Sequence, residues 1–215
     1  MNFRRHLTGQ NIALVTVFAG FIAASTIWGG VELAAGVPIT LQTFAVLLAG
    51  AVLGPWRGLA SVAIYLILGS AGLPIFAGHT VGATAWFSFS AGFLIGFLPA
   101  AFVTGWIVRG LRQRNALTFA GAFGAAVIGG ILVLYPIGWG YFAWKTGSSF
   151  DATVLIAVPF VIGDLIKCAL VALVATAVHR AYPWILPANS KASSKANPPA
   201  ASGNPAEESD ALATA

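Results

Sequence analysis

One acidic and one basic side chain lie three residues apart inside a long apolar stretch of the chain. They are Asp164 and Lys167, within the run of residues 153–178. A spacing of three places both side chains on one face of a helix. At bilayer depth each charge costs roughly 2.5–3.5 kcal/mol, and pairing offsets part of that cost. A structural ion pair between helices is one explanation, but the cost favours a functional site.

The chemistry of this pair indicates a binding site for a small polar ligand. The Lys167 ammonium donates hydrogen bonds and attracts a carboxylate, whereas the Asp164 carboxylate accepts N–H bonds. A suitable ligand therefore carries both N–H donors and an acidic group. The nearest other carboxylate in the sequence, Asp151, is thirteen residues away, and no nucleophile–base pair accompanies it. We therefore expect a binding site with no catalytic residue, and no enzyme activity.

The sequence gives no evidence for metal binding or for nucleotide hydrolysis. The three histidines, His6, His79 and His179, lack the spacing of metal ligands, and Cys168 is the single cysteine. No Walker A pattern is present, so we do not expect ATP hydrolysis. The sequence predicts neither a metal nor a cofactor.

Weaker candidates for ligand contacts lie where apolar segments begin or are connected. Gln42 and Thr43 follow Pro38 and Thr40 at the start of an apolar segment. Their side chains offer hydrogen bonds at the outer boundary of the membrane, although capping of a helix is an alternative role for Thr40. His79 lies in a glycine-rich connection, where a solvated loop histidine is the alternative.

The composition places these residues in a membrane. Of the 215 residues, 58% are hydrophobic and only 8% are charged. Soluble domains carry about 25% charged residues, so an ordinary soluble enzyme is excluded. A disordered chain needs low hydrophobicity and high charge, and it is excluded as well. A polytopic membrane protein remains.

Six apolar segments predict an all-α integral membrane protein with six transmembrane helices. Four segments reach the ~20 residues that a spanning helix needs. The second and third are shorter, are separated by Gly54 and Pro55, and form either a short spanning pair or a re-entrant hairpin. We expect one membrane domain, residues 1–187, and a disordered cytoplasmic tail, residues 188–215, which has no aromatic residue. The segments are residues 12–31, 41–53, 59–73, 87–108, 117–135 and 153–178.

The positions of the cations predict which side of the membrane each connection faces. With both termini in the cytoplasm, nine Lys and Arg side chains face inward, Lys145 faces outward and Lys167 lies within a segment. This asymmetry follows the positive-inside rule, and it explains the net charge of +5 without nucleic-acid binding. The outer connection between the fifth and sixth segments holds Trp139, Tyr141 and Trp144, which we expect to be interfacial anchors.

Three sequence blocks resemble the BioY family. Residues 36–55 read GVPITLQTFAVLLAGAVLGP and are similar to the family signature. Residues 72–78, GLPIFAG, resemble the next block, and residues 159–167, PFVIGDLIK, resemble the last helix. The resemblance extends over residues 12–178. BioY proteins are the substrate-binding S components of energy-coupling-factor (ECF) transporters for biotin.

This resemblance implies a function, a site and partners. It implies biotin uptake across the bacterial inner (cell) membrane, with biotin bound from the outer side by Asp164 and Lys167. Biotin has a ureido ring with N–H donors and a valerate carboxylate, which fits this pair. The implied partners are a transmembrane coupling protein and cytoplasmic ATPase subunits.

The first segment contains small residues at helical spacing. Ala19 and Ala23 match the Ala-x-x-x-Ala pattern through which S components commonly dock onto their partner, and Gly20 and Ala24 repeat the spacing one residue on. Ordinary packing between helices of this chain is the alternative, because small residues are common in membrane helices.

One block departs from the family pattern, so we also consider functions other than biotin binding. Residues 86–93 replace the glycine-rich run that usually enters the fourth segment, and His79, Thr80, Ser88 and Ser90 are candidates for polar contacts there. An S component for thiamin or riboflavin is disfavoured by the block at residues 40–43. A lipid-modifying enzyme would need converging acids or a nucleophile–base pair. An assembly protein with only packing roles would not explain an intramembrane ion pair.

Overall fold

The computed structural model describes residues 9–26, 31–34 and 37–186, which are mostly helical. The described part of each of the six apolar segments is mainly helical, which confirms the predicted all-α class. The predicted tail, residues 188–215, lies outside the described residues. The principal helices are α1 (Gly9–Ala24), α2 (Gln42–Leu53), α3 (Pro55–Ser70), α5 (Ala91–Gln113), α6 (Phe119–Val127), α7 (Leu134–Thr146) and α8 (Phe150–Ala181).

Within the described ranges, three helical stretches are long and apolar enough to cross a membrane. They are α5, α8 and the continuous helix Phe119–Thr146, in which the π-helical turn η3 (Ile128–Val133) joins α6 to α7. Helices α1 and α2 are apolar but shorter. These lengths are those of an integral membrane protein, and the count of six spans stays a prediction.

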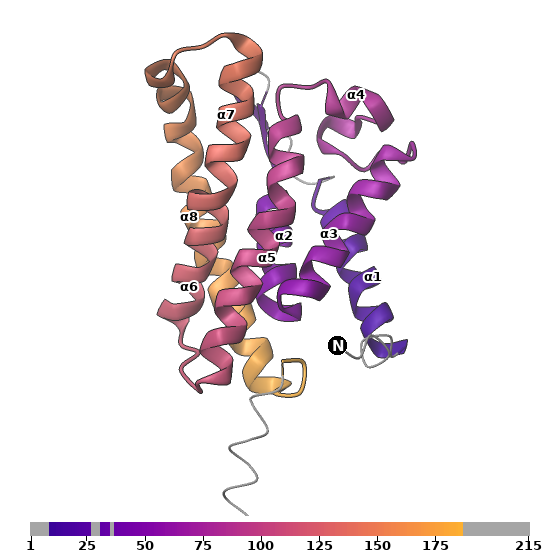
Figure 1. Cartoon of the computed structure of the whole chain (residues 1–215), viewed down its shortest axis with the longest axis vertical. Helices are drawn as coiled ribbons and strands as arrows, with labels where there is room; N and C mark the ends of the chain where they lie inside the picture. Colours follow the sequence, from indigo (N-terminus) through magenta and orange to yellow (C-terminus); the bar gives the residue numbers. More distant parts are fainter. Residues whose placement is uncertain (1–8, 27–30, 35–36, 187–215) are drawn as a thin grey trace, which may run out of the picture.

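Short elements connect the long helices. Strands β1 (Val31–Ala34) and β2 (Val37–Ile39) form an antiparallel hairpin between α1 and α2, which the sequence analysis did not predict. The 3-10 turn η2 (Ala77–His79) and α4 (Gly82–Trp86) lie between α3 and α5. In Figure 1, α4 and the α7–α8 connection lie at one end of the bundle, and the start of α1 and the end of α8 lie at the other.

Hydrogen bonds from arginine side chains connect several helices where α1 begins. Arg57, next to the α2–α3 turn, donates to Asn11 Oδ1 at 3.1 Å and to the carbonyl oxygen of Ile185. Arg112, near the end of α5, donates to the carbonyl oxygen of Pro183 at 3.1 Å. The ends of α1, α5 and α8 thus meet at one level with the α2–α3 turn. This convergence agrees with the predicted clustering of cations on one side.

Helix α2 runs through the centre of the bundle, and glycines let its neighbours approach closely. Every residue from 45 to 53 is buried. A Cβ on Gly50 would lie 2.2 Å from the carbonyl oxygen of Ala101 in α5, and one on Gly105 would lie 2.7 Å from the carbonyl oxygen of Gly50. Small residues are what permit such contacts between membrane helices. Gly54, with φ of 83°, and Pro55, at the start of α3, form the tight turn after α2.

The fifth apolar segment continues further than predicted. Trp139, Tyr141 and Trp144 lie in α7 and not in an outer connection, so that placement was wrong. Trp139 is buried, whereas Trp144 is exposed. Pro136 lacks the N–H that an uninterrupted α-helix uses, and the π-helical turn directly before α7 rearranges the bonds so that the helix continues.

Candidate ligand-binding pocket

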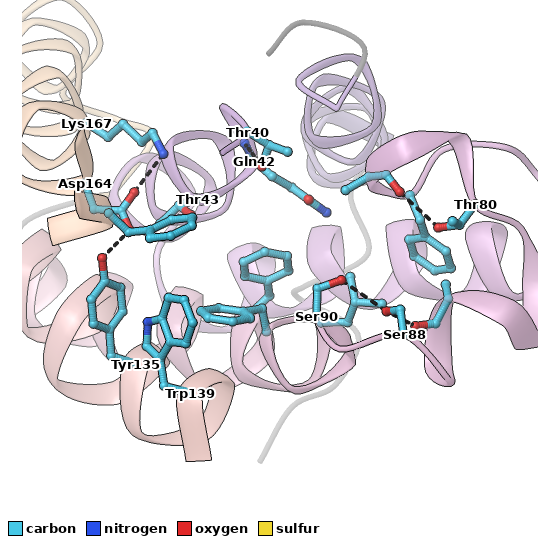
Figure 2. Close-up of a pocket in the computed structure, with 17 residues that line it drawn as sticks. Thr40, Gln42, Thr43, Thr80, Ser88, Ser90, Tyr135, Trp139, Asp164 and Lys167 are labelled. Atoms are coloured by element: carbon cyan, nitrogen blue, oxygen red, sulfur yellow. Dashed lines mark hydrogen bonds and ion pairs between the residues drawn. The ribbon is translucent and has the colours of Figure 1, made fainter. Parts of the chain in front are cut away.

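A pocket opens between α2, the η2–α4 region, α5, α7 and α8 (Figure 2). The space free of atoms between these elements, with the open mouth included, is about 630 Å³. Four predicted site residues line it together, although they come from two helices far apart in the sequence. These four are Gln42, Thr43, Asp164 and Lys167.

Asp164 and Lys167 form a buried ion pair on one face of α8. Lys167 Nζ lies 2.7 Å from Asp164 Oδ1, and the two residues are only 9% and 6% exposed. Tyr135 of α7 donates a hydrogen bond to the other oxygen, Asp164 Oδ2, at 2.8 Å. We call these three residues the ion-pair cluster. Both carboxylate oxygens have a donor, and the cluster has no net charge.

Trp139 lies one turn beyond Tyr135 on α7 and forms part of the same wall (Figure 2). Its ring meets Phe93 and Phe160 edge-on, with centroid distances of 5.3 and 5.2 Å. It is 6% exposed, and its Nε1–H has no hydrogen-bond partner among the described residues. Buried polar groups nearly always have a partner. This unpaired N–H is therefore a candidate donor to a bound group.

Hydrogen bonds also set the orientation of Gln42. Its Nε2 donates to the Tyr65 hydroxyl at 2.5 Å, and that hydroxyl donates to the carbonyl oxygen of Ile75 at 3.2 Å. The backbone N–H of Gln42 donates to Thr40 Oγ1 at 3.2 Å, so Thr40 also stabilises the start of α2. One N–H of the amide nitrogen is thus engaged, and the amide oxygen and the second N–H of Gln42 remain for a ligand.

Hydroxyl groups line the side of the pocket opposite the ion-pair cluster (Figure 2). The Oγ atoms of Ser88 and Ser90 lie 3.1 Å apart, and Thr80 Oγ1 donates to the carbonyl oxygen of Ala77 at 3.0 Å. These three residues lie in or beside the block that departs from the family pattern. Aromatic rings lie between the two polar sides. The pocket thus suits a ligand that is polar at both ends and apolar between them.

His79 is the predicted site residue that the pocket geometry does not test. It belongs to η2, where its neighbours Ala77 and Thr80 line the pocket. Its side chain lies outside the described residues. Contact between His79 and a ligand stays a prediction.

The two small-residue patterns of α1 face different ways. Ala19 is buried, and Ala23 is half-buried against the core. Gly20 and Ala24 are exposed, and a Cβ on Gly20 would meet nothing within 4 Å. The second pattern therefore lies on the accessible face of α1, and docking through Ala19 and Ala23 stays a prediction.

Sequence reasoning missed Tyr135 and Trp139 as site residues. The predicted segment ended at residue 135, so Trp139 was assigned to a connection. Once the helix is known to continue, a spacing of four places both side chains on one face. The four-residue spacing of Tyr135 and Trp139 was the available signal. It was not used because the helix was expected to end at residue 135.

Fold and pocket together define a helical integral membrane protein with a pocket lined by a buried ion pair. The family model described as "BioY family" matches residues 2–184. The chain therefore belongs to the BioY family.

Individual relatives are similar over most of their length. "Biotin transporter BioY" of Rhodobacter capsulatus is 41% identical over 186 residues, covering 82% of this chain and 97% of the relative. "Probable biotin transporter BioY" of Pyrococcus horikoshii is 36% identical over 163 residues, covering 75% and 93%. A crystal structure described as the S-component for biotin from an ECF-type ABC transporter matches with a TM-score of 0.76 at 23% identity, covering 84% of this chain and 95% of that one. The two structures share a fold.

Proposed function

We propose that this protein binds biotin in the pocket and acts as the S component of an ECF-type transporter in the bacterial cell membrane. The observation that carries the proposal is the buried pair of Asp164 and Lys167, held by Tyr135 beside the unpaired N–H of Trp139. Relatives named as biotin transporters support biotin over thiamin or riboflavin. Their names describe transport and not catalysis, in line with a binding site that lacks a catalytic residue.

The charge of the ion-pair cluster supports one orientation of biotin. A ligand carboxylate beside Asp164 would add a second negative charge to a buried site. The uncharged ureido ring avoids this, because its N–H groups match the Asp164 oxygens and its carbonyl oxygen matches Lys167 and the N–H of Trp139. The valerate carboxylate then extends between the aromatic rings toward Ser88 and Ser90. The alternative orientation, in which Lys167 binds the carboxylate, stays a prediction.

The proposed partners are the transmembrane coupling protein and the cytoplasmic ATPase subunits of an ECF transporter. The sequence has no Walker A pattern, so energy from ATP must come from other chains. The crystal structure with the same fold is itself described as a component of an ECF-type ABC transporter. Docking through Ala19 and Ala23 on α1 belongs to this proposal.

Equilibrium binding of labelled biotin to the purified full-length protein in detergent tests the proposal. The key variant is Lys167→Ala, and the matched control is Lys145→Ala, which removes a lysine outside the pocket. We expect tight binding by the wild type and the control and loss of binding by Lys167→Ala. Absence of binding by a folded wild type would refute the proposal, and a panel with thiamin and riboflavin would follow.

A further inference from the structure

A second hollow lies at the other end of α2 from the ligand-binding pocket. Three arginines line it: Arg57 from α3, and Arg109 and Arg112 from α5. Two tryptophans, Trp56 and Trp184, line it as well, and both are exposed. We call this hollow the arginine cleft.

The arginine cleft has positive charge without a balancing carboxylate. Within the described ranges the acidic residues are Glu32, Asp151 and Asp164, and none of them lines the cleft. Arg112 Nε is buried and has no hydrogen-bond partner among the described residues. Because an arginine readily donates two bonds to one phosphate or carboxylate, the cleft is suited to an anion.

A groove continues from the arginine cleft along α5. The two hollows share Pro55, Trp56 and Arg109. The groove is apolar beside Phe102 and Trp106, and Gln113 and Arg114 line it near the end of α5. The rings of Trp56 and Phe102 meet edge-on at a centroid distance of 5.1 Å, and Trp106 is exposed. Exposed tryptophans of membrane proteins concentrate at the level of the lipid headgroups. The surface is therefore cationic at one end and apolar at the other, at the depth where lipid phosphates lie.

We propose that the arginine cleft binds the phosphate of an anionic phospholipid, with an acyl chain of that lipid along the groove beside Phe102 and Trp106. A lipid matches both halves of the surface. A water-soluble anion would occupy the cleft and leave the apolar groove uncovered. Basic pockets between membrane helices at the cytoplasmic interface recognise anionic headgroups by the same charge chemistry.

The test compares lipid affinities of the full-length protein in detergent. Thermal unfolding is followed while phosphatidylglycerol or, as the zwitterionic reference, phosphatidylcholine is added. The variant Arg109→Gln/Arg112→Gln leaves Arg57 and its hydrogen bonds to α1 intact. The matched control is Arg180→Gln, which removes an exposed arginine near the end of α8 that lines neither hollow. We expect stabilisation by phosphatidylglycerol and not by phosphatidylcholine, roughly tenfold or more weaker apparent affinity in the double variant, and affinity within about twofold of wild type in the control.

Three outcomes would overturn the proposal. Equal stabilisation by inorganic phosphate would make the cleft a site for a free anion. Equal loss of lipid affinity in Arg180→Gln and the double variant would mean that the overall positive charge, and not the arginine cleft, determines lipid affinity. Unchanged lipid affinity in the double variant, together with lost association with the ECF coupling protein, would assign the cleft to protein docking. Labelled biotin binding by the double variant, or its circular dichroism if biotin does not bind, establishes that the variant is folded.

Discussion

The hydroxyl of Tyr135 donates to one oxygen of the Asp164 carboxylate, and the ammonium of Lys167 donates to the other. The first donor comes from α7 and the second from α8, so two helices together fix the plane of the carboxylate. Replacing a buried ion pair by apolar residues is often neutral or stabilising. Stability alone therefore does not account for the cluster, which supports its proposed role in ligand binding.

Removal of the Asp164 charge is expected to abolish biotin binding. Asp164→Asn leaves the Lys167 ammonium buried without its counter-charge and replaces one acceptor oxygen by a donor. We expect at least a 100-fold loss of affinity in equilibrium binding of labelled biotin, which corresponds to about 3 kcal/mol. The control Asp151→Asn changes an exposed carboxylate at the start of the same helix and should bind normally. Normal binding by both Asp164→Asn and Lys167→Ala would contradict the assigned site.

Tyr135→Phe tests the contribution of the donor on α7. The substitution keeps the ring and removes the hydrogen bond to Asp164 Oδ2. Hydrogen bonds to charged groups contribute about 1.5–3 kcal/mol, so we expect biotin affinity to fall by roughly tenfold or more. Isothermal titration calorimetry measures this change. The control is Tyr141→Phe, which removes a hydroxyl on the same helix that bonds to the carbonyl oxygen of Trp86 outside the pocket lining. Equal effects of the two variants would argue against a specific role of Tyr135.

Trp139→Phe tests whether the unpaired indole N–H meets the ligand. Phenylalanine keeps an aromatic ring against Phe93 and Phe160 but offers no donor. We expect biotin affinity to fall by about tenfold, the worth of roughly one hydrogen bond. Competition binding against labelled biotin provides the measurement, with Trp144→Phe on the exposed face of α7 as the control. An unchanged affinity in Trp139→Phe would mean that the N–H is not a ligand contact.

Gly50→Ala tests the close packing around α2. The added Cβ would lie 2.2 Å from the carbonyl oxygen of Ala101, and backbone must move to accept it. We expect a loss of about 2 kcal/mol or more in the free energy of unfolding, seen as a lower thermal unfolding temperature in detergent. Gly124→Ala is the matched control, because its Cβ would meet nothing within 4 Å. In a helix this change is expected to stabilise by up to about 1 kcal/mol. Equal stabilities of the two variants would contradict the described packing.

Single cysteines test the predicted orientation in the membrane. The native Cys168 is buried, so it should react slowly with a membrane-impermeant maleimide. We expect Asp151→Cys, at the end of the bundle with the α7–α8 connection, to be labelled in intact cells. Arg114→Cys, after α5, should be labelled only once the membrane is permeabilised. The reverse pattern would invert the orientation derived from the charge distribution.

Helices and the ion pair were accessible from sequence because their signals are local. A long apolar run specifies a membrane helix by itself. The spacing of Asp164 and Lys167 places both on one face without knowledge of any neighbour. The tight turn at Gly54 and Pro55 has an equally local signature.

Contacts between distant helices were not accessible in this way. The partner of Asp164 on α7 depends on how α7 packs against α8, and the bond from Gln42 to Tyr65 joins two helices across the core. The arginine cleft likewise requires that the α2–α3 turn, α5 and the end of α8 meet. None of these pairings leaves a periodic trace in the sequence.

The π-helical turn η3 changes the direction in which the side chains of α7 point. A π-helical turn holds one residue more than an α-helical turn, and each residue of an α-helix advances the side chains by about 100°. Gly129 and Gly130 allow η3 to lie against α5 and α2, since added Cβ atoms would come within 2.0 Å of Thr104 Oγ1 and 2.8 Å of Leu47 Cδ1. Without that extra residue, α7 would keep nearly the same length and position. Tyr135 and Trp139 would then point about 100° away from the pocket that they line, so this wall of the pocket depends on the extra residue in η3.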